Sequence, residues 1–151
     1  MSEETTRAVV SRWFDALDAG DFDTAMACLD DNIHWINSPA EEGKPGGVPE
    51  LSAIIPWLGD FSSKEEVIAT FGPWGERQER VTYERLNMVF NDDQALVLVH
   101  EAARIKATGL IYDIEFVQRL QVAGDVIVLL KAYWDTSQAV AAFRGDMPAR
   151  L

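Results

Sequence analysis

Apolar and polar residues alternate along most of the second half of the chain, and this period of two predicts a β-sheet. Side chains of a strand point alternately to its two faces, and β-branched and aromatic residues favour strands. Three long antiparallel strands are predicted, joined by turns at Thr108-Gly109 and Ala123-Gly124-Asp125. The three strands span residues 94–107, 110–122 and 125–135, and a fourth run precedes them over residues 81–90.

Each long strand has one face almost free of charge, and these faces are predicted to form the core. The inward residues are Ala95, Val97, Val99, Glu101, Ala103 and Ile105 in the first strand, Tyr112, Ile114, Phe116, Gln118, Leu120 and Val122 in the second, and Val126, Val128, Leu130, Ala132 and Trp134 in the third. Glu101 is the only charged residue among them. A lone carboxylate on an apolar face either finds a partner or stays protonated, because desolvation can raise its pKa by several units.

Apolar residues at helical spacing predict two helices near the start of the chain. The first has an apolar stripe of Val9, Val10, Trp13, Phe14 and Leu17, and Gly20 ends it. Asp21 is the expected N-cap of the second, whose apolar residues are Phe22, Ala25, Met26 and Leu29. The two helices are expected to form a hairpin with one common apolar side.

Capping signals predict two further helices. Ser63 and Glu66 form a capping box that opens a helix, which we expect to end at Gly72-Pro73. Residues 136–144 predict a short closing helix, with Asp135 and Gln138 as its capping residues.

A short strand and a long irregular segment lie between the second and third predicted helices. In the strand, residues 32–37, Trp35 and Asn37 share a face, and His34 points to the other side. Residues 38–61 contain four of the six prolines and four glycines, which is typical of a lid, a binding loop or a disordered segment. Trp57 is the residue of this segment best suited to close over a ligand.

These elements predict an α+β fold in one domain spanning residues 1–151. We expect a cone-shaped α+β barrel, in which a curved antiparallel sheet of four long strands and a short one is wrapped by three N-terminal helices. Helices laid across the concave side of a curved sheet leave a hollow, and such a hollow is the default place for a small molecule.

Composition narrows the range of partners. The net charge of −12 argues against a nucleic-acid backbone or an anionic membrane surface. Cys28 is the only cysteine, and the N-terminus lacks the pattern of a signal peptide, so a cytoplasmic location is expected. The two histidines, His34 and His100, are far apart and no close ligand pair accompanies them, so we expect neither a metal nor a cofactor.

The order of elements and two local motifs resemble a known superfamily. The motifs are Trp13-Phe14-Asp15-Ala16-Leu17-Asp18-Ala19-Gly20-Asp21 and Ala132-Tyr133-Trp134-Asp135. Together they resemble the SnoaL-like branch of the nuclear transport factor 2-like superfamily, over essentially the whole chain. That group includes polyketide cyclases, ketosteroid isomerases and limonene epoxide hydrolases, so the resemblance implies the fold more strongly than any one reaction.

The resemblance also implies which positions carry chemistry in relatives. The epoxide hydrolase set of an arginine and two aspartates falls on Val99, Glu101 and Ala132, so only one of its three groups is matched by a polar residue here. The ketosteroid isomerase base falls near Ile36 or Asn37, where no carboxylate occurs, and the tyrosine of its first helix is matched by Trp13. Neither mechanism is therefore copied in full.

Glu101 remains the candidate acid/base, reached both from strand alternation and from its position in the superfamily. One interpretation is a cofactor-independent isomerase, cyclase or hydrolase acting on an apolar, oxygen-bearing molecule. The alternative is a ligand-binding or dimerisation module that has lost the catalytic groups, with Glu101 as a buried anchor. The residues expected to contact a ligand are Trp13, Leu17, Trp35, Asn37, Trp57, Ala103, Ile114, Phe116, Gln118, Ala132 and Trp134.

The opposite face of the sheet is too apolar to be turned wholly to water. It is predicted to carry Leu96, Leu98, Ala102, Ile111, Val117, Ile127, Leu129 and Tyr133. We therefore expect a homodimer through this outer face, with His100 as a surface or interface group there.

Overall fold

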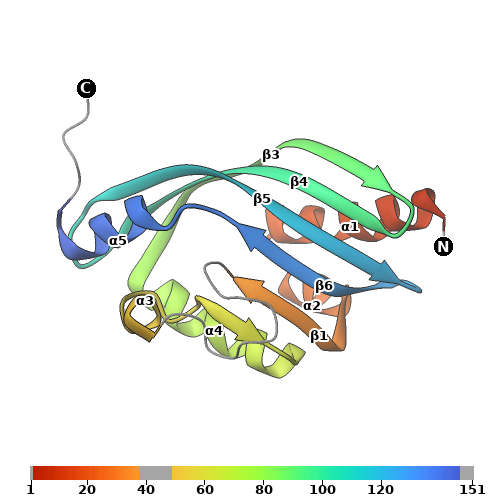
Figure 1. The fold of residues 1–151 in the computed structure, drawn as a ribbon, viewed down its shortest axis with the longest axis horizontal. Coiled ribbons are helices and arrows are strands. Elements are labelled where there is room, and N and C mark those ends of the chain that lie inside the picture. Colours follow the sequence, from red (N-terminus) through yellow and green to blue (C-terminus); the bar gives the residue numbers. More distant parts are fainter. Residues whose placement is uncertain (1, 38–48, 147–151) are drawn as a thin grey trace.

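The computed structural model describes residues 2–37 and 49–146, which form the expected α+β fold (Figure 1). The helices are α1 (Glu3–Asp18), α2 (Phe22–Ala27), α3 (Pro49–Ile54), α4 (Lys64–Arg77) and α5 (Ser137–Arg144). The strands are β1 (Leu29–Asn37), β2 (Gly59–Phe61), β3 (Gln78–Asn91), β4 (Gln94–Ile105), β5 (Ile111–Ala123) and β6 (Val126–Tyr133).

The strands form one curved, open sheet in the order β2-β1-β6-β5-β4-β3. The predicted meander is confirmed, because β3, β4, β5 and β6 pair antiparallel in sequence order. The short strand pairs parallel with β6, through Trp35 opposite Leu130 and Asn37 opposite Ala132. This parallel pair brings the start of the chain beside its last strand and completes the concave face.

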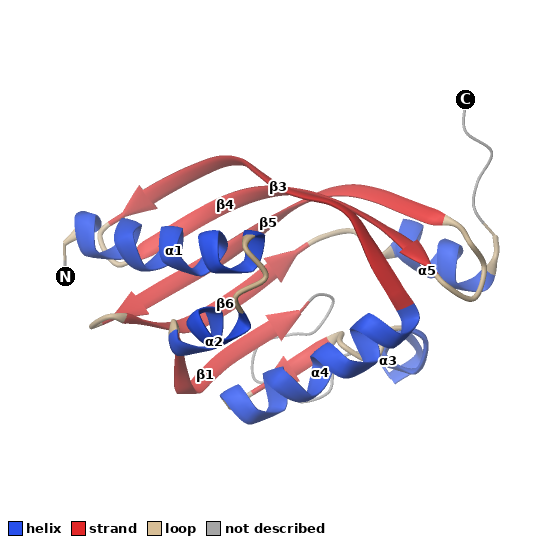
Figure 2. Cartoon of the chain, turned by 180° about the vertical axis from the view of Figure 1, so that it is seen from behind, coloured by secondary structure: helices blue, strands red, loops and turns tan. Residues whose placement is uncertain are grey.

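Helices α1, α2 and α4 lie over one side of the sheet (Figure 2). Helix α1 contacts β3, β4, β5 and β6, whereas α4 contacts β1 and β3, which lie far apart in the strand order. Because α4 bridges those distant strands, it spans the open side of the curved sheet. The sheet and these helices together give the cone predicted from the sequence.

The predicted helix starts are confirmed by their caps. The Asp21 carboxylate accepts a hydrogen bond from the Thr24 amide at 3.1 Å, and the Ser63 hydroxyl accepts one from the Glu66 amide at 3.1 Å. The Glu66 carboxylate accepts in return from the amide of Ser62, at 2.7 Å. The bonds to Thr24 and Glu66 satisfy amides that a helix leaves unpaired in its first turn, and the bond to Ser62 holds the residue before the N-cap.

The predicted end of the third helix is wrong. Helix α4 continues through Gly72 and Pro73 to Arg77. A proline inside a helix removes one backbone bond, yet packing of the following turn can outweigh that loss. Here Trp74, in the continued turn, packs against Trp57 with ring centroids 6.4 Å apart.

The predicted capping of the closing helix is also wrong in detail. The N-cap of α5 is Thr136, without a side-chain bond, and Asp135 accepts from the Ser137 amide at 2.9 Å. The Gln138 side chain does not return to the cap, because its oxygen accepts a hydrogen bond from the Asp113 amide in β5. Gln138 therefore attaches the helix to the sheet.

A register shift in the sheet changes the predicted faces of β6. Leu130 and Ala132 point inward as expected, but a shift between Gln121 and Val122 pairs Val122 with Ile127. Ile127 is consequently in the core with no exposed surface, so its predicted place on the outer face is wrong. A bulge reverses the side-chain alternation beyond it, which strict alternation cannot foresee.

Part of the segment predicted to be irregular is ordered in helix α3 and strand β2, while residues 38–48 of it lie outside the described residues. Helix α3 contacts α5 at one end of the molecule. Among the helices of the described ranges, none has the length and apolar character to cross a membrane.

Candidate functional site

A cavity of about 340 Å³ lies between the concave face of the sheet and helices α1, α2 and α4. Nine of the eleven predicted contact residues line it, and so does Glu101. Those nine are Trp13, Leu17, Trp35, Asn37, Trp57, Phe116, Gln118, Ala132 and Trp134. Most of the lining side chains are aromatic or aliphatic, which suits an apolar ligand.

The other two predicted contact residues do not line this cavity. Ala103 is fully buried in a separate apolar cluster with Ile105 and Tyr112. Ile114 is the cross-strand neighbour of Glu101 and packs between that cluster and the main core. Strand alternation predicts the direction in which a side chain points. It does not predict whether neighbouring side chains separate that residue from a cavity.

Glu101 occupies the wall of the cavity contributed by β4, between Tyr83 of β3 and Ile114 of β5. Burial raises the pKa of its carboxyl group to about 7, and the guanidinium of Arg80 acts in the opposite direction. In the part of the chain that the structure describes, no residue makes a hydrogen bond or an ion pair with this carboxyl group. Among the described residues, the Glu101 carboxyl group therefore has no bond that would give it a purely structural role.

Two buried polar atoms that line the same cavity have no hydrogen-bond partner among the described residues. They are Nε1 of Trp13 and Oε1 of Gln118, whose side chains are 2% and 7% exposed. The amide nitrogen of Gln118 donates to the hydroxyl of Tyr83 at 3.3 Å, which fixes its orientation. Buried polar groups are nearly always paired, so this donor and this acceptor remain available for a hydrogen bond inside the cavity.

Asn37 lines the cavity but also has a structural role. Its side-chain nitrogen donates to the carbonyl of Trp57 at 3.2 Å, and its oxygen accepts from Nε1 of Trp134 at 2.9 Å. These bonds hold two of the aromatic walls in place. Trp57, expected to close over a ligand, is 6% exposed and packs against Trp74 and Phe143, so it forms a wall of the cavity.

Several lining residues were not among the contact residues expected from the sequence, and three of them bear on the chemistry of the site. Arg80, Tyr83 and Trp74 all face the cavity. Arg80 lies just before the predicted start of the fourth strand, and β3 lacks a clean alternation that would assign a face to Tyr83. Trp74 follows the glycine-proline pair at which the helix was expected to end.

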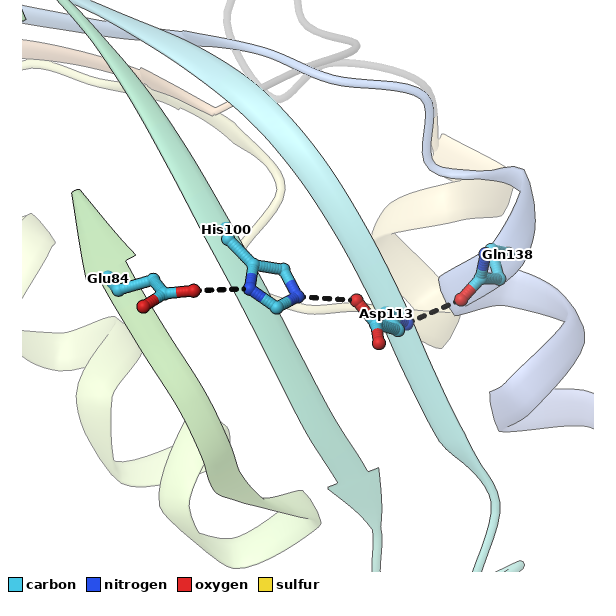
Figure 3. A network of polar contacts seen from close by, with 4 residues as sticks. All are labelled: Glu84, His100, Asp113 and Gln138. Atoms are coloured by element: carbon cyan, nitrogen blue, oxygen red, sulfur yellow. Dashed lines mark hydrogen bonds and ion pairs between the residues drawn. The ribbon is translucent and has the colours of Figure 1, made fainter. Parts of the chain in front are cut away.

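Both histidines lie outside the cavity lining. Nε2 of His34 is 2.6 Å from a carboxylate oxygen of Asp60, which joins β1 to β2. On the outer face, the ring of His100 lies between two carboxylates, with Nδ1 2.8 Å from Glu84 and Nε2 2.7 Å from Asp113 (Figure 3). The bond to Glu84, followed by that to Asp113, raises the pKa of His100. Within the described ranges, no three His, Cys, Asp or Glu side chains are placed to hold a metal ion.

An open, curved sheet with helices over its concave face and a cavity between them defines the nuclear transport factor 2-like class of folds. The chain belongs within it to the SnoaL-like domain family, whose family model matches residues 10–130.

Solved structures show the same fold. An NTF2-like protein from Burkholderia xenovorans LB400 is 22% identical and superposes with a TM-score of 0.76, covering 95% of this chain and 98% of that one. A candidate SnoaL-like polyketide cyclase from Mesorhizobium loti is 18% identical, with a TM-score of 0.64 over 85% of this chain and 97% of that one. TerC, co-crystallised with polyporic acid, is 10% identical, with a TM-score of 0.70 over 93% and 98%. Among curated proteins, none matches the chain.

Proposed function

We propose that this SnoaL-like protein binds an apolar, oxygen-bearing small molecule and moves a proton on it with Glu101, without a cofactor. The observation that supports this most directly is a carboxyl group with a pKa of about 7 on the wall of an aromatic cavity. A group whose pKa lies near the working pH both takes and returns a proton efficiently, which contributes roughly 10² to 10⁴ in rate. Relatives called a polyketide cyclase and a protein co-crystallised with polyporic acid have the same fold.

In the proposed step, the Glu101 carboxylate removes a proton from a carbon beside a ligand carbonyl. The electron pair of the broken C–H bond moves to the carbonyl oxygen and forms an enolate. Nε1 of Trp13, which has no partner among the described residues, supplies a hydrogen bond to that oxygen. Glu101 then returns a proton to carbon, either at the same position, as in exchange, or at another, as in isomerisation.

The experiment that tests this step is proton exchange on a small ketone. In D₂O, the protein should catalyse exchange of the protons at C1 of 2-tetralone, followed by NMR. We expect Glu101→Gln to lower the rate by roughly 10² or more, because the amide cannot accept the proton. The rate of the unchanged protein should rise with pH through about 7 and then level off, as the carboxyl group ionises.

A matched control is Glu115→Gln, the same change at an exposed residue of the neighbouring strand β5. It should leave both the exchange rate and its pH dependence unchanged. Exchange at the same rate in Glu101→Gln, or no catalysed exchange in the unchanged protein, would refute the acid/base role.

The alternative is a binding protein without turnover, and the residues at two positions of the concave sheet face favour it. Val99 and Ala132 occupy positions where relatives with epoxide hydrolase chemistry carry polar groups, and both are buried among apolar neighbours. A protein that binds aromatic probes tightly but shows no exchange would support this alternative.

We also propose, as a partner, a second copy of the chain on the outer sheet face, where Leu96 and Tyr133 are exposed.

A further inference from the structure

Arg80 lies where two cavities meet. It is on the inward face of β3, opposite Ala103 of β4. It lines the main cavity and also a second cavity of about 250 Å³, which shares Leu17, Phe22 and Trp74 with the first. A ligand that extends from the main cavity toward the second one therefore passes Arg80.

The guanidinium of Arg80 is held by aromatic rings and not by an acid. It lies 4.4 Å from the ring centroid of Tyr83 and 5.9 Å from that of Trp74. In the ranges that the structure describes, it has no ion pair or hydrogen bond, whereas Arg85 pairs with Asp15 and Asp18. Arg80 is an exposed residue, so water can solvate its guanidinium group in the free protein. The guanidinium group lies near these rings without an acidic partner among the described residues, so its N–H groups are available to a planar anion.

We propose that Arg80 binds a carboxylate of the ligand, so that the site takes a planar, conjugated carboxylic acid. Arg–carboxylate pairs are often bidentate, which fixes the orientation of the bound molecule. The aromatic walls would hold its body, with Trp13 Nε1 and Gln118 Oε1 available to a carbonyl and a hydroxyl on it. This inference rests on the proposed function, because it assumes that the cavity holds a small molecule.

A ligand carboxylate at Arg80 also affects the proton on Glu101. The charged or titratable groups around Glu101 in the cavity wall are Arg80 and Tyr83 from β3 and Tyr112 from β5, while α1 and α4 contribute uncharged residues there. Arg80 alone among these favours the carboxylate form of Glu101. A bound anion neutralises Arg80, so the complex should take up a proton near pH 7 and affinity for the acid should rise as the pH falls.

The test compares an acid with its uncharged ester. Binding of 2-naphthoate and of methyl 2-naphthoate is measured by quenching of tryptophan fluorescence, in the unchanged protein and in Arg80→Gln. We expect Arg80→Gln to weaken binding of 2-naphthoate about tenfold or more and to change binding of the ester less than twofold. Arg104→Gln, which removes an exposed arginine paired with Glu79 on the outer face, is the control and should change neither.

The outcomes separate this inference from the proposed function. Equal weakening of both probes in Arg80→Gln, or of neither, would overturn the carboxylate site, while exchange of 2-tetralone that depends on Glu101 would still uphold the acid/base role. Failure of both probes to bind the unchanged protein would overturn the carboxylate site, and the absence of catalysed 2-tetralone exchange as well would overturn the proposed function. The midpoint of thermal unfolding shows whether each variant is folded. Arg80→Lys keeps the positive charge but loses the planar guanidinium group, so it should recover part of the preference for the acid over the ester.

Discussion

At the scale of single residues, burial gives an ordinary side chain an unusual property. Glu101 has no unusual neighbour in the sequence, and its raised pKa follows from its place in a low-dielectric wall without a bonding partner. Trp13 is the complementary case, since its indole N–H is buried without a partner among the described residues. The Glu101 carboxyl group and the Trp13 N–H therefore both lack a bonding partner among the described residues. In the proposed function, a ligand C–H acid meets the first and a ligand oxygen meets the second.

The variant Trp13→Phe tests whether the buried indole N–H serves the proposed reaction. The variant keeps an aromatic ring against Trp35, whose centroid is 6.0 Å away, but removes the N–H. Because the smaller ring loses buried contacts but no hydrogen bond among the described residues, we expect the free energy of unfolding to fall by about 1–2 kcal/mol. Exchange of 2-tetralone should slow by roughly 10², because the enolate oxygen loses its donor. Urea unfolding and NMR measure the two effects, and an unchanged exchange rate would contradict the donor role.

At the scale of elements, a row of polar side chains connects three strands on the outer face of the sheet. Glu84 of β3, His100 of β4 and Asp113 of β5 form a continuous network, and the Asp113 amide extends it to Gln138 of α5 (Figure 3). Both ring nitrogens of His100 lie near carboxylate oxygens, so the doubly protonated imidazolium is the form that satisfies both contacts.

This network predicts a pH-dependent contribution to stability. The pKa of His100 is raised in the folded state, so folding is favoured by its protonation. That contribution is fully present below the unfolded pKa of about 6.5 and is lost as the pH rises through the higher folded value. Urea unfolding from pH 6 to pH 9 should therefore show a decline that is absent in His100→Gln. Equal slopes for the two proteins would show that the network does not stabilise the charged ring.

The helix boundaries show which features could be predicted from neighbouring residues in the sequence. The caps at Asp21 and Ser63 were predictable because each depends on residues within one helical turn. The passage of α4 through Pro73 was not predictable, because it depends on the packing of Trp74 against Trp57 from another element. The position of Arg80 was missed because β3 begins at Gln78, before the start at residue 81 that the sequence predicted.

At the scale of the whole molecule, the sheet has two unlike sides. The concave side is covered by helices and encloses the cavity, whereas the outer side leaves Leu96 and Tyr133 47% and 45% exposed. A half-exposed apolar sheet face is a common basis for association. The proposed dimer would leave both cavities on the sides away from the contact.

The dimer is tested by mass in solution. Light scattering after size exclusion should give twice the 16.8 kDa of one chain. Leu96→Glu should give the monomer mass, because it places a charge in the proposed contact. Ile68→Glu changes a residue that is 45% exposed on α4, away from the outer face, and should leave the dimer intact. A monomer mass for the unchanged protein would rule out this contact.

The amino-acid sequence by itself determined which side chains share a face, because strand and helix periods are local properties of the backbone. It therefore indicated the fold class, the isolated carboxyl group of Glu101 and most of the cavity lining. Only the tertiary structure decided that β1 lies parallel to β6, that Ile127 turns inward, and that Arg80 stands unpaired among described residues beside the same cavity. Those features depend on contacts between residues distant in sequence, where packing, and not local periodicity, sets which groups meet.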